Sequence, residues 1–221
     1  HVVLTDKGIT SAEEFLLARY FMYWNVYFHK ATRSSETLLE LAVRRAVALV
    51  QGGAKADLGF LPPALEPVLS GEPLSLAQYV ALDETDVLYA IKRWTAAPDP
   101  VLADLSGRFL NRRLFAGIRL DGPLDPEQEE AVRRALRGAG FDPDYYYQID
   151  RAASATYQYY VTQDAGPTPI QILLSWTDPP QLREVTEVSQ VLRGIATQPV
   201  SRSFLFVPRE AAEGVRAALL R

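Results

Sequence analysis

The segment that decides the fold class reads Ala18-Arg19-Tyr20-Phe21-Met22-Tyr23-Trp24-Asn25-Val26-Tyr27-Phe28-His29-Lys30. Helical spacing places Arg19, Tyr23, Tyr27 and Lys30 four, four and three residues apart on one face, and Arg33 extends that face by one turn. An ordinary core helix fills such a face with Leu, Ile and Val. We call these five residues the Arg–Tyr stripe. They offer guanidinium groups to phosphate oxygens and phenol rings to a base or a sugar hydroxyl.

Short motifs extend this pattern over about residues 1–116: Ala18-Arg19-Tyr20-x-Met22-Tyr23, Val26-Tyr27-x-His29-Lys30, Leu82-Asp83-x-x-Asp86-Val87 with Trp94, and Arg112-Arg113-Leu114-Phe115. With these motifs the chain resembles the HD-domain phosphohydrolase superfamily, in the branch of the deoxynucleoside triphosphate triphosphohydrolases. The resemblance implies a metal-dependent hydrolase that acts on (deoxy)nucleoside triphosphates. It also implies a nucleotide as partner and a homo-oligomeric assembly.

The resemblance implies two substrate contacts within the Arg–Tyr stripe. In relatives, the arginine that matches Arg19 contacts the triphosphate, and the tyrosine that matches Tyr27 packs on the deoxyribose and base. Tyr23 shares the helical face and is a third candidate, although no family role transfers to it. The alternative is ordinary packing, because aromatic residues at helical spacing usually belong to a core. Partial core roles are expected for Met22, Trp24, Val26 and Phe28.

Four cationic residues are candidates for an effector site or a subunit interface. His29 and Lys30 match a pair that lies near an allosteric nucleotide at a subunit junction in some relatives. Arg112 matches an arginine that touches an activator nucleotide there, but Ala116 replaces the lysine that follows it. Arg33 completes the set as an extension of the stripe. The alternative for this group is a solvated or subunit-facing cationic patch.

The residue types that bind metal in this superfamily are scarce. HD enzymes hold their cation through a His, a His-Asp pair and a later Asp. The chain has two histidines, His1 and His29, and neither is followed by Asp. With no cysteine present, thiolate sites are excluded as well. We therefore expect a C-terminal portion of a longer enzyme, whose divalent metal is bound upstream, and no catalysis by this chain alone.

Asp83 and Asp86 are three residues apart and would share one helical face, as a metal-binding pair would. However, Asp83 stands where a helix N-cap belongs, and Asp86 in the first turn would interact favourably with the helix dipole. The capping interpretation is therefore preferred.

Composition excludes several classes of protein. The 221 residues are 48% hydrophobic, which is enough for a substantial core. The net charge of −4 argues against broad electrostatic capture of nucleic acid. The apolar runs are short of a membrane span, so a cytoplasmic location is expected.

The predicted elements divide the chain into a helical part and an α+β part. Residues 1–111 read as a mainly α continuation of an HD-type domain. The helical pattern over about 11–50 predicts either one long helix or two with a bend near 32–35, and further helices are expected at 75–80, 84–96 and 100–111. Residues 112–221 alternate strands at 114–120, 145–149, 156–162, 170–174 and 201–207 with helices at 126–138, 182–195 and 209–220. This order predicts a ferredoxin-like domain for assembly or regulation. A non-catalytic module for nucleotide sensing or oligomerisation is the alternative function.

Overall fold

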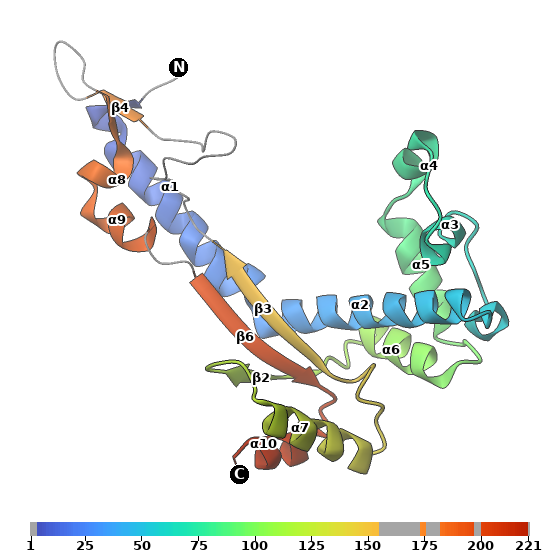
Figure 1. Cartoon of the computed structure of the whole chain (residues 1–221). Coiled ribbons are helices and arrows are strands. Elements are labelled where there is room, and N and C mark those ends of the chain that lie inside the picture. The colour runs from blue at the N-terminus through green and yellow to red at the C-terminus, as the bar shows by residue number, and fades with distance from the viewer. Residues whose placement is uncertain (1–3, 155–172, 176–181, 197–199, 221) are drawn as a thin grey trace. The chain divides into compact units, whose positions relative to one another are not determined.

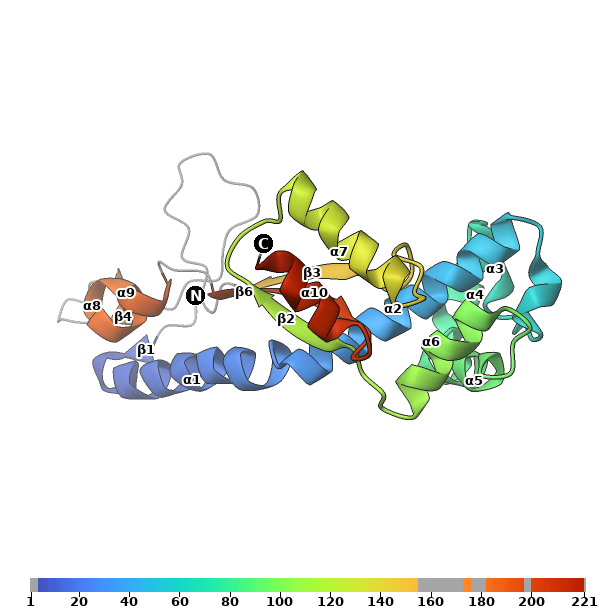
Figure 2. The ribbon, with the colours of Figure 1, turned by 90° about the horizontal axis from the view of Figure 1, so that it is seen from below.

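The computed structural model describes residues 4–154, 173–175, 182–196 and 200–220. The chain forms two compact units, His1–His29 with Arg151–Arg202 and Lys30–Asp150 with Ser203–Arg221. Figure 1 labels their helices and strands, and Figure 2 shows them from below. None of the helices within the described residues is long and apolar enough to span a bilayer.

The first unit is organised around helix α1. Its elements are β1 (Leu4–Thr5), η1 (Asp6–Gly8), α1 (Ile9–Met22), the π-helix η2 (Tyr23–Tyr27), β4 (Leu173–Ser175), β5 (Leu182–Glu184), α8 (Val185–Val188) and α9 (Gln190–Ala196). Ala12 and Leu16, four residues apart, are buried in α1 and pack with Val185 and Leu192. A small sheet has the order β1-β4-β5, in which β1 is parallel and β5 antiparallel to β4.

The second unit begins with α2 and the helices that follow it along the chain. They are α2 (Lys30–Gln51), η3 (Lys55–Leu58), α3 (Glu66–Ser70), α4 (Leu76–Ala81), α5 (Glu84–Trp94) and α6 (Pro100–Leu110). Leu38 and Leu41 of α2 are fully buried with Leu102 and Leu105 of α6. Trp94 of α5 is also fully buried, and its indole Nε1 donates a hydrogen bond to the Phe60 carbonyl at 2.8 Å.

Local sequence signals explain where these helices begin. Asp99 accepts a hydrogen bond from the Leu102 amide at 2.8 Å and precedes a proline at the first position of α6. Asp83 and Asp86 form a capping box at the start of α5: Asp83 accepts from the Thr85 amide at 2.7 Å, and Asp86 accepts from the Asp83 amide at 3.3 Å. These contacts confirm the capping interpretation of the aspartate pair.

A three-stranded antiparallel sheet with two helices completes the second unit. The sheet has the order β2-β6-β3 and is formed by β2 (Ala116–Leu120), β6 (Val200–Val207) and β3 (Gln148–Ser154). The second unit holds β6 from Ser203 onward and β3 as far as Asp150, together with α7 (Pro126–Gly138) and α10 (Ala212–Leu219). β2 is antiparallel to β6, with Ala116 opposite Val207, and β3 and β6 run in opposite directions in Figure 1.

The alternation of β6 gives this sheet two packed faces. Leu205 and Val207 belong to a cluster with Val132 of α7 and Val215 of α10. Phe204 and Phe206 instead join the cluster that includes the buried face of α2. Successive side chains of a strand point to opposite faces, so one strand connects both cores.

The structure has helices over most of the positions where residues 1–111 were expected to be helical, but the bend in the first stretch lies at another position. Of the two alternatives for 11–50, the structure has two helices, α1 and α2, and the break between them lies at Phe28 and His29 rather than near 32–35. The Phe28 amide bonds to the Tyr23 carbonyl at 2.9 Å, which is the five-residue spacing of a π-helix, and the His29 amide bonds to Val26 at 3.2 Å. These bonds end the first helix before α2 begins.

The ferredoxin-like prediction is not confirmed. The described residues show a mostly helical chain with a small three-stranded antiparallel sheet. The strand expected at 170–174 appears as β4 and pairs with β1, and the helix expected at 182–195 begins as a strand, β5, and continues as α8 and α9. The hairpin expected at 156–162 lies outside the described residues. The expected domain boundary at 111/112 falls inside the second unit and stays a prediction.

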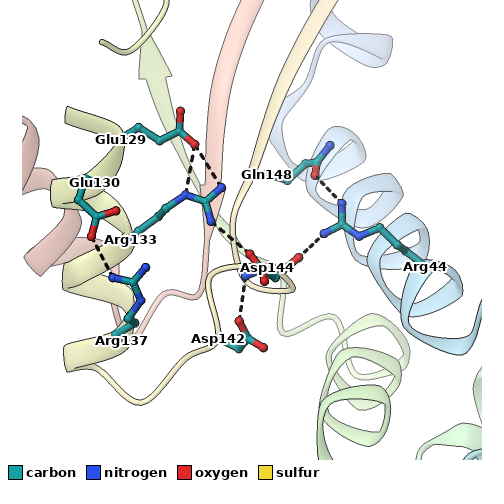
Figure 3. A network of polar contacts seen from close by, with 8 residues as sticks. All are labelled: Arg44, Glu129, Glu130, Arg133, Arg137, Asp142, Asp144 and Gln148. Carbon is teal, nitrogen blue, oxygen red and sulfur yellow. Dashed lines mark hydrogen bonds and ion pairs between the residues drawn. The ribbon is translucent and has the colours of Figure 1, made fainter. Parts of the chain in front are cut away.

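The strand expected at 145–149 begins later, at Gln148, because residues before it form a turn. The amides of Tyr145 and Tyr146 both bond to the Asp142 carbonyl, and the Asp142 side chain accepts from the Asp144 amide at 3.0 Å. Figure 3 shows how neighbouring elements hold this turn: Arg133 of α7 bonds to the Asp144 carboxylate at 3.2 Å.

Arg44 of α2 contacts the same turn from its other side. Its guanidinium group donates to the Asp144 carbonyl and, at 3.5 Å, to the Gln148 side chain (Figure 3). A charged side chain from each of two helices thus bonds to the turn that precedes β3, although the three tyrosines at 145–147 have high strand propensity.

Candidate functional site

Three members of the Arg–Tyr stripe lie in contact where α1 passes into η2. Arg19 donates a hydrogen bond from Nη2 to the Tyr23 hydroxyl at 3.1 Å, and its Cζ lies 5.2 Å from the Tyr23 ring centre. The Tyr23 and Tyr27 rings are 5.0 Å apart between centroids and are tilted by 51°. We call Arg19, Tyr23 and Tyr27 the aromatic–arginine cluster.

Residues in and next to the π-helix differ in how far they are buried. Phe28 is 5% exposed and packs against Tyr20, Tyr23 and Trp24. Tyr27, by contrast, is 45% exposed. The partial core role expected for Phe28 and Trp24 is thus found, whereas Met22 and Val26 are exposed. Single π-helical turns are frequent at functional sites.

The aromatic–arginine cluster has the chemistry of an anion-binding site with an adjacent stacking surface. Among the described residues, the hydrogen-bond partner of Arg19 is a phenol and not a carboxylate, so the guanidinium charge is not neutralised. The bond to Tyr23 and the ring contact orient the guanidinium group, and an oriented guanidinium group loses less conformational entropy when it binds an anion. The exposed ring of Tyr27 provides an apolar face for a sugar or base.

The other two members of the stripe, Lys30 and Arg33, belong to α2 in the second unit. Arg33 makes a bidentate ion pair with Asp150, whose side chain is 14% exposed, and it also pairs with Glu36. This hydrogen bonding raises the pKa of Arg33 above its ordinary value. The pairing favours a structural role for Arg33, since the N–H groups of its guanidinium already donate to the carboxylates of Asp150 and Glu36.

Arg112 lies in the turn between α6 and β2 and has a φ of 53°, in the left-handed region. The next amide, that of Arg113, bonds back to the Arg108 carbonyl at 2.9 Å and closes the turn. Arg108 itself is buried and paired with Asp104 and Glu210. The Arg112 side chain is exposed at the surface of the second unit.

Sequence reasoning missed two arginines that lie with Lys30. Arg209 and Arg216 line the same hollow of the second unit as Lys30 does. Their separation of seven residues equals two helical turns and was an available signal. The helix expected at 209–220 begins only at Ala212 in the structure, so Arg209 precedes α10 and does not share its face.

The described part of the chain contains no group of three or more His, Asp or Glu side chains placed to hold a metal ion.

Comparison with known proteins places the aromatic–arginine cluster inside a recognised region. Residues 1–58 match the family described as HD associated region. Over 214 residues the chain is 30% identical to the uncharacterised protein YwfO of Bacillus subtilis, covering 95% of this chain and 47% of YwfO.

Two solved structures are similar to this chain over most of its length. A crystal structure of a phosphohydrolase from Bacteroides thetaiotaomicron superposes with a TM-score of 0.75 at 26% identity, covering 94% of this chain and 52% of that one. A hypothetical protein from Aquifex aeolicus shares the fold, with a TM-score of 0.59 at 17% identity over 99% of this chain and 47% of its own. The chain thus spans about half the length of these relatives. Together, the match to the HD associated region and the match to the phosphohydrolase support an HD-domain-related family for this chain.

Proposed function

We propose that this chain supplies the substrate-binding part of an HD-type phosphohydrolase that acts on (deoxy)nucleoside triphosphates. The observation that carries the proposal is the aromatic–arginine cluster, in which Arg19, within the described residues, bonds to a phenol rather than to a carboxylate and lies in the same cluster as the half-exposed Tyr27. The cluster lies within residues 1–58, which match the HD associated region. The similarity to a phosphohydrolase supports the reaction class.

Each residue of the cluster has a proposed part in binding. Arg19 binds the triphosphate and offsets the negative charge that develops on it during phosphate transfer. Tyr27 packs on the sugar and base and thereby fixes the position of the phosphate chain. Tyr23 is a positioning residue, because its hydroxyl and ring hold the guanidinium group of Arg19.

A divalent metal is the expected cofactor of the intact enzyme, where it would polarise phosphate and activate water. The described residues do not present a ligand set for it. The proposal therefore assigns no residue of this chain to the metal.

The test is substrate turnover by the full-length protein carrying Arg19→Ala, with Arg93→Ala as matched control. Arg93 is also exposed and also lies over an aromatic ring, 4.8 Å from the Phe60 centroid, but it belongs to α5. We expect Arg19→Ala to lower kcat/KM for dGTP by roughly 100-fold or more, as loss of a charge-stabilising donor commonly does. The melting temperature should stay within a few degrees. Unchanged turnover in Arg19→Ala would refute the proposal.

A further inference from the structure

Helix α4 exposes large apolar side chains that this chain does not cover. Leu76, Tyr79 and Val80 are 78%, 68% and 73% exposed, and Leu76 precedes the other two by three and four residues, so they share one face. A capping box of Ser75 and Gln78 starts the helix, but no residue of this fully described helix is buried. An isolated helix of this length is marginally stable at best in water. The α4 face, which we define as Leu76, Tyr79 and Val80, therefore has the character of a surface that a partner covers.

Helix α5 continues this surface and adds charges to it. Two residues, Leu82 and Asp83, separate the helices, and Figure 1 shows α4 beyond the N-terminal end of α5. On α5, Glu84, Leu88 and Lys92 follow one another at four-residue spacing, and all three are exposed. We call these three residues the α5 face.

The charges of the α5 face lie symmetrically about its leucine. Glu84 precedes Leu88 by four residues, and Lys92 follows it by four. The two charges are about 12 Å apart along the helix, so they cannot pair with each other. Within the part of the chain that the structure describes, no ion pair includes either of them. An acid and a base on either side of an exposed leucine are thus available to a partner.

We propose that α4 and α5 form an interface with a second copy of this chain, in which the two α5 helices run antiparallel across a twofold axis at Leu88. Such an axis brings Leu88 against its own copy and Glu84 of each copy against Lys92 of the other, because both charges are four residues from Leu88. The antiparallel arrangement also aligns the two helix dipoles favourably. The charge pattern of the α5 face is complementary to itself, which favours a second copy over an unrelated partner.

The same axis gives the α4 face a partner. Because α4 precedes α5, an antiparallel pair places α4 of each copy beside the C-terminal end of the other copy's α5. Thr95 and Ala96, which follow α5, are small and exposed there. The α4 face then supplies apolar area to the interface, and the pairs of Glu84 with Lys92 determine its register.

This surface differs from the subunit junction that the resemblance implies. That junction involves His29, Lys30 and Arg112, whereas the interface proposed here belongs to α4 and α5 and requires neither a nucleotide nor a metal. The proposed function can therefore fail without affecting this interface, and the converse also holds.

Sedimentation equilibrium of the 221-residue chain tests the interface. We expect a dimer, with a mass of about twice the 24.6 kDa of one chain. Glu84→Lys and Lys92→Glu each place like charges opposite one another at two symmetry-related contacts, so each should raise the dimer Kd by about 10-fold or more. Glu127→Lys is the matched control, because Glu127 is also an exposed acid in the first turn of a helix, α7, and its Kd should be unchanged.

Two combinations of these variants restore opposite charges at both contacts. They are the double variant Glu84→Lys/Lys92→Glu and an equimolar mixture of the two single variants, and both should dimerise as the unaltered chain does. The double variant carries the folding cost of both substitutions. Its recovery would therefore show that the single variants fail through repulsion and not through unfolding.

Cross-linking locates the axis, because the chain contains no cysteine of its own. Leu88→Cys should form an intermolecular disulfide under mild oxidation, since a disulfide requires Cβ atoms about 4 Å apart. Leu110→Cys is the control: Leu110 is 40% exposed but lies at the end of α6, and its cysteine variant should remain uncrosslinked.

Three results would overturn the proposal. The first is a monomeric chain, which would mean that a partner other than a second copy covers the α4 face. The second is a dimer whose Kd is the same in both charge reversals, or which the double variant and the mixture do not restore. The third is cross-linking of Leu110→Cys as readily as of Leu88→Cys.

Discussion

The guanidinium group of Arg33 donates two hydrogen bonds to the carboxylate of Asp150, and the one from Nε to Oδ2 is 2.8 Å long. The two residues are 117 positions apart in the sequence. Arg33 belongs to the second turn of α2, and Asp150 to β3. The pair therefore ties the edge strand of the sheet to the longest helix of the second unit.

We expect Asp150→Asn to lower the free energy of unfolding by about 1–3 kcal/mol, because it leaves the partly buried Arg33 charge with a weaker partner. Urea denaturation at pH 7 measures the change. Glu66→Gln is the control: Lys55 and Glu66 form an ion pair at 2.8 Å whose side chains are 50% and 47% exposed. Exposed pairs contribute at most about 1 kcal/mol. Equal effects of the two substitutions would contradict a structural role for the Arg33–Asp150 pair.

The Arg45–Asp99 pair predicts a loss of stability in acid. Burial opposes the charge on Asp99, but hydrogen bonds from Arg45 and from the Leu102 amide outweigh it and hold the pKa of Asp99 below its ordinary value. A carboxyl group with a lowered pKa in the folded state stabilises the fold above its unfolded pKa, near 3.9, and loses that contribution as the pH falls through the folded value.

Urea denaturation at pH 7 and at pH 3 tests this expectation. The unaltered chain should lose more stability over this interval than Asp99→Asn does, because Asn cannot be protonated in this range. Asn is also a good N-cap, so the start of α6 should be preserved. The same loss of stability in both proteins would show that Asp99 does not contribute to the acid response.

The substitution Tyr23→Phe tests whether Tyr23 positions Arg19 through its hydroxyl or only packs through its ring. The substitution removes the hydroxyl that accepts the 3.1 Å bond from Arg19 but keeps the ring that packs on Phe28. In the full-length protein we expect kcat/KM for dGTP to fall by roughly 3–10-fold, the cost of one hydrogen bond, with no change in melting temperature. Tyr20→Phe serves as control, since its ring joins the same packing cluster. A Tyr23→Phe enzyme with unaltered kinetics would leave Tyr23 as a packing residue.

Dependence on a metal distinguishes the enzyme from its alternative, a non-catalytic module for nucleotide sensing or oligomerisation. We expect the full-length protein to release phosphate groups from dGTP in the presence of a divalent cation and to stop when EDTA removes it. The 221-residue chain should not hydrolyse dGTP under either condition. Chromatographic separation of the nucleotide products measures both. Binding of dGTP by the full-length protein without hydrolysis would favour the module.

Much of the helical architecture was predictable because its signals are local. Asp83 and Asp125 each cap the helix that follows them, and each is bonded reciprocally by the residue three positions on. The buried positions Leu38 and Leu41, three residues apart, mark the inner face of α2. Caps and helical periodicity act within one or two turns, so a sequence contains all the information they need.

Strand pairing was less predictable because it depends on distant partners. The sequence around β4 fits a strand in any sheet, and only the tertiary structure pairs it with β1. The tyrosines at 145–147 have strand propensity, yet Arg133 and Arg44 hold a turn just before them at Asp144. Long-range contacts of this kind override local propensity.

For the candidate site, the sequence by itself determined which residue types follow one another at helical spacing and hence that Arg19, Tyr23 and Tyr27 would meet. The tertiary structure decided the rest. The π-helical bond from the Phe28 amide to the Tyr23 carbonyl ends the helical face that carries Arg19, Tyr23 and Tyr27. Lys30 and Arg33 therefore belong to a new helix, α2, in the other unit. In the second unit, Arg33 forms an ion pair with Asp150, and Lys30 lines a hollow together with Arg209 and Arg216. The physical reason is range: helical spacing acts over a few residues, whereas these partners come from positions more than 100 residues away in the sequence.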